Sequence, residues 1–272
     1  MKTKNIIPYL LLLFVAPLSS GFAQKTTNSN IKVENITYTV GDKVYKGYVA
    51  YNENQKGKRP AILVVHEWWG LTDYPKMRAR KLAGLGYIAM AVDMFGNGKI
   101  ATNPTEAQAY TAPFYSNPQL ATTILDAALI KIKGYKQTDP SNVYAIGYCF
   151  GGAILLNYAK LGGDLKAVVS FHGGLQGVTP DKDLLKAKIL VCNGGSDKFV
   201  PEADITTFKH QMDSIGATYT FKSYPGAVHA FSNPAATELG KKFKMAIEYN
   251  KDADVNSWND MKKFLSSLAL KK

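Results

Sequence analysis

The chain has 272 residues, of which 46% are hydrophobic and 20% are charged, a composition typical of a globular protein that excludes extensive disorder. Its formal net charge of +12 comes from Lys and Arg residues scattered along the chain, which indicates a solvated basic surface. The sequence has no zinc-ligand spacing and no aromatic RNA-binding signature, so nothing beyond this charge supports nucleic acid as a partner.

The first residues form a pattern of their own. Two lysines precede an apolar run over residues 6–17, and Gly21 and Ala23 supply the small side chains that a signal peptidase requires. The run is shorter than the roughly 20 residues of a membrane-spanning helix, which disfavours the alternative of a membrane anchor. We therefore expect residues 1–23 to be a secretory signal peptide. The mature protein would be exported, to the periplasm or the medium, with no stable membrane association.

The remaining chain predicts an α/β fold. Apolar alternation across a Gly-Asp pair predicts an antiparallel hairpin over residues 31–51. Short apolar runs, each expected to be a strand, then occupy residues 61–65, 87–92, 143–146, 167–171, 189–192 and 219–224. Helical spacing is found near residues 74–85, 118–134, 150–161, 202–215 and 239–268. This alternation predicts a mostly parallel sheet covered by helices on both faces, in a single domain over residues 27–270.

One cysteine lies where a nucleophile is expected. The strand at residues 143–146 runs into Gly-Tyr-Cys-Phe-Gly over residues 147–151, and a helical pattern follows. This is the strand-turn-helix context of a nucleophile elbow, with Cys149 in the place of serine. The glycines permit the sharp turn, and the start of a helix favours a thiolate. The alternative is a buried structural cysteine; the flanking glycines favour a nucleophile.

Two further residues follow strands in the order that this elbow requires. In such enzymes the nucleophile is followed along the chain by an acid and then a histidine. Asp197 comes directly after the strand at residues 189–192, and His229 lies just past the strand at residues 219–224. Asp197 could instead cap a helix, and His229 could be an ordinary surface histidine. Their order predicts that Asp197 orients His229 and that His229 acts as the general base for Cys149.

The loop after the first parallel strand is expected to supply one oxyanion-hole amide. That amide would belong to Trp68, and the other would belong to Phe150, which follows the nucleophile. Core packing is an equal alternative for both neighbouring tryptophans. The residues expected to line the substrate pocket are Trp69, Phe95, Asn97, His172 and Phe231. His172 could instead satisfy hydrogen bonds in the core.

Four motifs together resemble the dienelactone hydrolases. They are His-Glu-Trp-Trp-Gly at residues 66–70, Gly-Tyr-Cys-Phe-Gly-Gly at 147–152, Gly-Gly-Ser-Asp at 194–197, and Gly-Ala-Val-His-Ala-Phe at 226–231. The resemblance implies an α/β-hydrolase fold and the hydrolysis of an ester or lactone. It also implies a switching role for Glu67, in which substrate binding moves the carboxylate so that a resting, neutral cysteine becomes a thiolate. The alternative for Glu67 is a structural salt bridge.

The sequence departs from this family where arginines hold the carboxylate of the dienelactone substrate. Asn97 and Asn233 stand at those places, and neither provides a charged fork for a carboxylate. We therefore expect a monomeric hydrolase of a small ester or lactone that is uncharged or differently charged. It would act through a Cys-His-Asp triad and an acyl-thioester, without a metal or an organic cofactor.

A thiol-redox or non-catalytic protein is the competing hypothesis. It would have a disulfide between Cys149 and Cys192, the two cysteines of the chain. In the expected sheet another strand separates them, so their Cα atoms would lie about 10 Å apart, beyond the roughly 7 Å that a disulfide spans. This distance favours the hydrolase.

Overall fold

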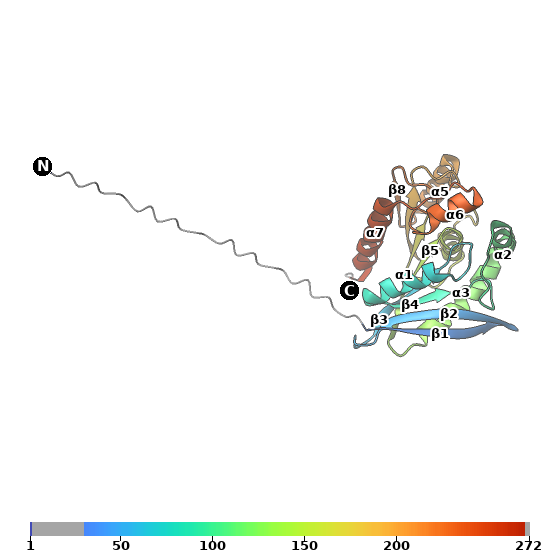
Figure 1. Cartoon of the computed structure of the whole chain (residues 1–272). Helices are drawn as coiled ribbons and strands as arrows, with labels where there is room; N and C mark the ends of the chain where they lie inside the picture. The colour runs from blue at the N-terminus through green and yellow to red at the C-terminus, as the bar shows by residue number, and fades with distance from the viewer. Residues whose placement is uncertain (2–29, 270–272) are drawn as a thin grey trace.

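The computed structural model describes residue 1 and residues 30–269, with an eight-stranded sheet at its centre (Figure 1). The expected signal peptide at residues 1–23 lies, apart from Met1, outside the described residues, and it stays a prediction. The strands are β1 (Ile31–Val40), β2 (Lys43–Asn52), β3 (Arg59–Val65), β4 (Ile88–Val92), β5 (Thr138–Tyr148), β6 (Ala167–Phe171), β7 (Lys188–Gly194) and β8 (Tyr219–Tyr224).

The sheet has the order β1-β2-β4-β3-β5-β6-β7-β8. The hairpin β1–β2 is antiparallel and pairs antiparallel with β4, whereas the strands from β4 across to β8 are all parallel. In Figure 1 the hairpin forms one edge and β8 lies toward the other. This confirms the predicted mostly parallel sheet with an N-terminal antiparallel hairpin.

Helices cover both faces of the sheet, as the long apolar strands require. They are α1 (Asp73–Gly84), α2 (Pro104–Ser116), α3 (Pro118–Lys133), α4 (Phe150–Lys160), α5 (Glu202–Ser214), α6 (Ala236–Phe243) and α7 (Lys251–Ala269). Side chains of α1 and α7 share one buried core with one face of the sheet. Side chains of α2, α3, α4 and α5 belong to the core on the opposite face. No helix within the described part of the chain is both long and apolar enough to cross a membrane.

Two helical regions differ from the prediction. The helix α2 was not expected; it buries only Ala107, Thr111 and Phe114 and contains a proline, so its apolar pattern is weak. The single helix expected over residues 239–268 is two helices, because α6 ends at Lys244 in a left-handed conformation with φ +54°. The chain between them runs beside the loop that follows β8, where the backbone amide of Asn250 donates to the carbonyl of Phe231 at 2.9 Å.

Candidate active site

Cys149 lies at the sharp turn between β5 and α4, with φ +52°, a conformation that costs a non-glycine residue energy. Both flanking glycines are needed for close approach. A Cβ atom on Gly147 would collide with the carbonyl of Gly151, and a Cβ atom on Gly151 would collide with the carbonyl of Val65. The local sequence therefore holds the cysteine at the carboxyl end of the sheet and at the N-terminus of α4.

A chain of hydrogen bonds joins three of the predicted residues. The Sγ atom of Cys149 lies 3.0 Å from Nε2 of His229, and Nδ1 of His229 lies 2.8 Å from Oδ2 of Asp197. The other carboxylate oxygen of Asp197 accepts from the amide of Phe199 at 2.9 Å, which fixes its orientation. Three loops, after β5, β7 and β8, thus bring together residues that are far apart in the sequence.

The charge state of His229 depends on these neighbours. Burial alone would lower the pKa of its imidazole, but the nearby sulfur of Cys149 and the hydrogen bond to Asp197 outweigh burial and raise the pKa to about 10. A protonated imidazole that lies between Cys149 and Asp197 is therefore a favourable state of this site.

Glu67 is buried at the wall of the same site, with a relative exposure of 5%. Its Oε2 accepts a 2.6 Å hydrogen bond from Nδ2 of Asn233. Burial raises the pKa of Glu67 to about 7, although Asn233, His229 and Arg78 act in the opposite direction. Within the described residues Glu67 makes no ion pair, so the alternative of a structural salt bridge is not what the structure has.

The raised pKa of Glu67 predicts a pH-dependent stability. Below about pH 4.5 the Glu67 carboxyl group is protonated in both the folded and the unfolded chain, and its favourable contribution to the free energy of unfolding is complete. This contribution is lost as the pH rises from 4.5 to about 7. We expect the wild type to lose about 3 kcal/mol more unfolding free energy than Glu67→Gln over this range. Urea denaturation of both proteins at about pH 4.5 and about pH 8 measures this difference in unfolding free energy. Glu238→Gln, at an exposed position, is the control. An equal change in unfolding free energy with pH for wild type and Glu67→Gln would contradict the prediction.

A buried histidine positions the loop that carries Glu67. Nε2 of His66 accepts from the amide of Met94 at 3.2 Å, and the carbonyl of His66 accepts from the amide of Gly151 at 3.1 Å. Burial lowers the pKa of His66 to about 4, so the ring is neutral. His66 therefore ties the loop after β3 to the start of α4, a role that its motif did not reveal.

These residues open into a cavity of about 440 Å³ with a largely apolar wall. Its volume suits a small organic molecule. Lys244 is its one Lys or Arg among the described lining residues. The amide of Phe150, the first residue of α4, is one of the donors that a helix leaves without an intrahelical partner. The wall includes Cys149, His229, Glu67, Trp68, Trp69, Tyr115, Phe150, Phe199 and residues 244–247.

Comparison with known proteins identifies the family of this chain. The model of the dienelactone hydrolase family matches residues 45–269. The chain belongs to the dienelactone hydrolase family. Membership in this family indicates a hydrolase that acts on esters or lactones and takes a small-molecule substrate.

Individual relatives agree with this assignment. A protein of Methylorubrum extorquens named "Putative carboxymethylenebutenolidase" is 30% identical over 230 residues, which cover 80% of this chain and 79% of that protein. Protein usf of Aquifex pyrophilus is 30% identical over 194 residues, covering 69% and 82%. The crystal structure of a dienelactone hydrolase-like promiscuous phosphotriesterase from metagenomic libraries has a TM-score of 0.83 at 30% identity, covering 88% of this chain and 99% of that one.

Two of the predicted pocket residues of this dienelactone hydrolase family member lie on a loop that turns away from the cavity. The buried carboxylate of Asp93 accepts from the amides of Phe95, Gly96 and Gly98 and folds the loop tightly. Phe95 consequently packs in the core against Phe150, and Asn97 is exposed. Neither residue lines the cavity, which corrects the prediction for both.

The prediction also needs correction for His172 and Phe231, which are fully buried behind the turn that holds Cys149 and do not line the cavity. Nδ1 of His172 accepts from the amide of Cys149 at 3.1 Å, and its Nε2 lies 2.8 Å from Oγ of Ser232. Burial, with His229 and Arg78, lowers the pKa of His172 well below its usual value, so the ring is neutral. The alternative of hydrogen bonding in the core therefore describes His172, whereas Trp69 both lines the cavity and stacks on Phe243.

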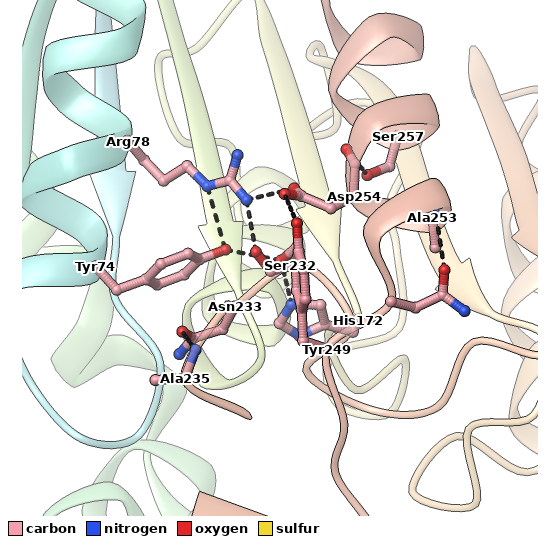
Figure 2. Close-up of polar contacts among 11 residues, drawn as sticks. Tyr74, Arg78, His172, Ser232, Asn233, Ala235, Tyr249, Ala253, Asp254 and Ser257 are labelled. Atoms are coloured by element: carbon pink, nitrogen blue, oxygen red, sulfur yellow. Dashed lines mark hydrogen bonds and ion pairs between the residues drawn. The ribbon is translucent and has the colours of Figure 1, made fainter. Parts of the chain in front are cut away.

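A polar network continues from His172 into the core, as Figure 2 shows. Oγ of Ser232 lies 2.8 Å from the hydroxyl of Tyr74, and the carbonyl of Ser232 accepts from Nη2 of Arg78 at 2.6 Å. The same guanidinium nitrogen forms an ion pair with Asp254 of α7. The network thus connects the turn that holds Cys149 with helices α1 and α7.

Several lining residues had no signal in the sequence. Tyr115 lies at the end of α2, Phe199 follows Asp197, and residues 244–247 follow α6; none belongs to a motif. Only the fold brings them to the cavity. The two cysteines are free, and β6 separates their strands, so the structure lacks the disulfide of the competing redox hypothesis. In the described part of the chain, no group of three or more His, Cys, Asp or Glu residues is placed to hold a metal ion.

Proposed function

We propose that the protein hydrolyses small carboxylic esters or lactones with Cys149 as the nucleophile, His229 as the acid-base group and Asp197 as the residue that orients His229. One observation carries the proposal: Sγ of Cys149, both ring nitrogens of His229 and Oδ2 of Asp197 form a continuous chain with links of 3.0 and 2.8 Å. Acyl transfer requires a nucleophile that is hydrogen-bonded to a base, and an acid that orients this base.

The proposed reaction has two halves. The Cys149 thiolate attacks the substrate carbonyl, and the backbone amides of Trp68 and Phe150 donate hydrogen bonds to the oxyanion. The carbon–oxygen bond to the alcohol breaks, and protonated His229 gives its proton to the departing alkoxide, which leaves a thioester on Cys149. His229 then takes a proton from water, the hydroxide attacks the thioester, and the carboxylic acid leaves as the thiolate is restored.

Glu67 has a switching role in this proposal, which the family resemblance suggested. Support comes from its position at the cavity wall and from a buried carboxyl group with a pKa of about 7. Its hydrogen-bond partner Asn233 is neutral, and none of the ion pairs among the described residues holds the carboxylate in place. Substrate entry would move this carboxylate and favour the charged pair of Cys149 and His229.

The expected substrate is an uncharged ester or lactone. The wall of the cavity is largely apolar, and of the two asparagines at the expected arginine places, Asn97 is exposed outside it and Asn233 is bonded to Glu67. A carboxylated lactone would find no bidentate partner there. The exposed Lys244 at the wall is a point charge without the fork geometry of arginine.

The test is ester hydrolysis by the purified protein beside Cys149→Ala, with p-nitrophenyl acetate and a panel of esters and lactones that includes dienelactone. We expect turnover by the wild type, loss of about 1,000-fold or more in Cys149→Ala, and poor turnover of dienelactone. The matched control is Cys192→Ala, which removes the other, fully buried thiol. An acyl group trapped on Cys149 and seen by mass spectrometry would support the thioester. Activity that persists in Cys149→Ala would overturn the proposal.

A further inference from the structure

A second pocket, open to solvent and called the second chamber below, lies beside the main cavity along α4. It has a volume of about 310 Å³. Ala153 and Asn157, one turn apart on α4, form part of its wall. Phe150, one turn before Ala153 on the same helix, lines the main cavity. Three residues line both spaces: Tyr115, Gly174 and Phe199. The two chambers therefore meet at a junction formed by two aromatic side chains and one glycine.

This junction is adjacent to the reacting groups. The ring of Phe199 lies 5.0 Å from that of His229, and the ring of Tyr115 lies 6.0 Å from that of Phe150, the residue after the nucleophile. A substrate whose carbonyl reaches Cys149 can therefore extend one of its two parts through the junction.

Gly174 leaves the junction open, although its backbone conformation does not require a glycine. Its φ is not in the left-handed region, in contrast to ten other glycines of the described chain. A Cβ atom at this position would meet only the Cβ atom of Ala153, at 3.8 Å, which is ordinary contact. The missing side chain thus corresponds to open space that joins the two chambers.

The chemistry of the second chamber differs from that of the main cavity. Its wall is about as polar as it is apolar, and its polar residues are Asn157, Gln176 and Asp204. Nε2 of Gln176 donates to both carboxylate oxygens of Asp204, at 3.0 and 2.9 Å, which holds the pair against the chamber. Among the described lining residues there is no Lys or Arg. This wall offers hydrogen-bond acceptors and a negative charge, so it suits neutral hydroxyl groups and repels anions.

We propose that the second chamber is a subsite for the alcohol part of the ester, and that this part carries hydroxyl groups. The inference rests on the proposed function. His229 must give its proton to the departing alcohol, and Phe199 at the junction packs beside His229. The acyl part then occupies the apolar main cavity, and the substrate is an ester of an apolar acid with a polyol.

The first test compares two esters that differ only in hydroxyl groups, glycerol 1-monobutyrate and propyl butyrate. We expect the wild type to prefer the glycerol ester in kcat/KM by about 3- to 10-fold, the effect of a hydrogen bond or two. Gly174→Leu would place a side chain in the junction and bring this ratio close to one, whereas Gly174→Ala would keep most of it. A ratio near one in the wild type, or an unchanged ratio in Gly174→Leu, would overturn the subsite.

A second pair of variants tests the polar wall. Asp204→Asn keeps the shape of the side chain and removes its charge, and we expect the preference for the glycerol ester to fall about 3-fold or more. Glu202→Gln removes the same charge from the first turn of α5, outside both chambers, and the ratio should stay at the wild-type value. Equal ratios in both variants would reject a role for Asp204.

Binding to Cys149→Ala separates the two proposals, because it requires no turnover. Calorimetry with this variant should show tighter binding of glycerol monobutyrate than of propyl butyrate, and Cys149→Ala/Gly174→Leu should lose the difference. Tighter binding of the glycerol ester together with no turnover by the wild type would keep the subsite and overturn the hydrolase. Turnover of both esters with equal kcat/KM and equal affinity would keep the hydrolase and overturn the subsite.

Discussion

Replacing Asp197 with asparagine is expected to lower kcat for ester hydrolysis by about 100- to 10,000-fold, a range that extends to the loss found when the acid of a serine triad is replaced in this way. The carboxylate side chain is fully buried and lies 2.8 Å from Nδ1 of His229. A neutral amide would no longer stabilise the protonated imidazole, and its NH₂ group would favour the tautomer that cannot accept a proton from Cys149. Steady-state kinetics with p-nitrophenyl acetate measure the loss.

The control for this variant is Asp183→Asn, which removes the same charge from an exposed loop residue. Its kcat should match the wild type. Circular dichroism and the urea midpoint would show that Asp197→Asn is folded, since the asparagine oxygen can still accept from the amide of Phe199. Retention of more than about a tenth of wild-type kcat would argue against Asp197 as the orienting acid.

Arg78→Met is expected to lower the free energy of unfolding by about 3–5 kcal/mol, because it leaves a carboxylate without its partner in the protein interior. The Arg78 side chain is 1% exposed; it pairs with Asp254 and donates to the carbonyl of Ser232. Its positive charge also lies over the ring of Tyr148, 5.5 Å from the centroid. Urea denaturation of wild type and variant measures the change.

Two comparisons make this stability prediction specific. Arg78→Met/Asp254→Leu removes both charges, and we expect it to lose less stability than Arg78→Met alone, because no unpaired charge remains. Lys241→Met breaks the exposed ion pair with Glu238, and a change below about 1 kcal/mol is expected. A loss in Arg78→Met no larger than that in Lys241→Met would contradict the buried-network interpretation.

The sequence predicted the sheet well, and the reason is the strength of its local signals. The parallel strands β3, β4, β6 and β7 are buried on both faces and appear as short apolar runs between helices. The strand β5 begins earlier than predicted, at Thr138, because its polar first half pairs with β3 across a shift in register at Pro60. Such pairing depends on a neighbouring strand, and no pattern within residues 138–142 indicates it.

The positions of the three residues of the proposed triad were predictable for the same kind of reason, and the residues of the cavity wall were not. Cys149 directly follows β5, and Asp197 and His229 lie in the short loops just past β7 and β8. The strand ends therefore fix roughly where each residue lies, and the structure brings the three into contact. Tyr115 and Phe199 reach the cavity through a helix end and a loop. Which way a loop side chain points depends on tertiary contacts. For Asn97, the hydrogen bond from the amide of Gly98 to Asp93 folds the loop so that the Asn97 side chain is exposed.

The division between sheet and loops has a consequence for how this protein could change during evolution. The cavity wall comes from loops after several strands, from the end of α2 and from the segment after α6, whereas the core lies in the strands and the helices that cover them. Phe150 and Val200 belong to both the wall and the core. Substitutions at exposed wall positions, such as Tyr115 and Phe199, alter few core contacts and carry a small penalty in folding. New substrate preferences could arise by drift in these loops while the chemistry proposed at Cys149 stays in place.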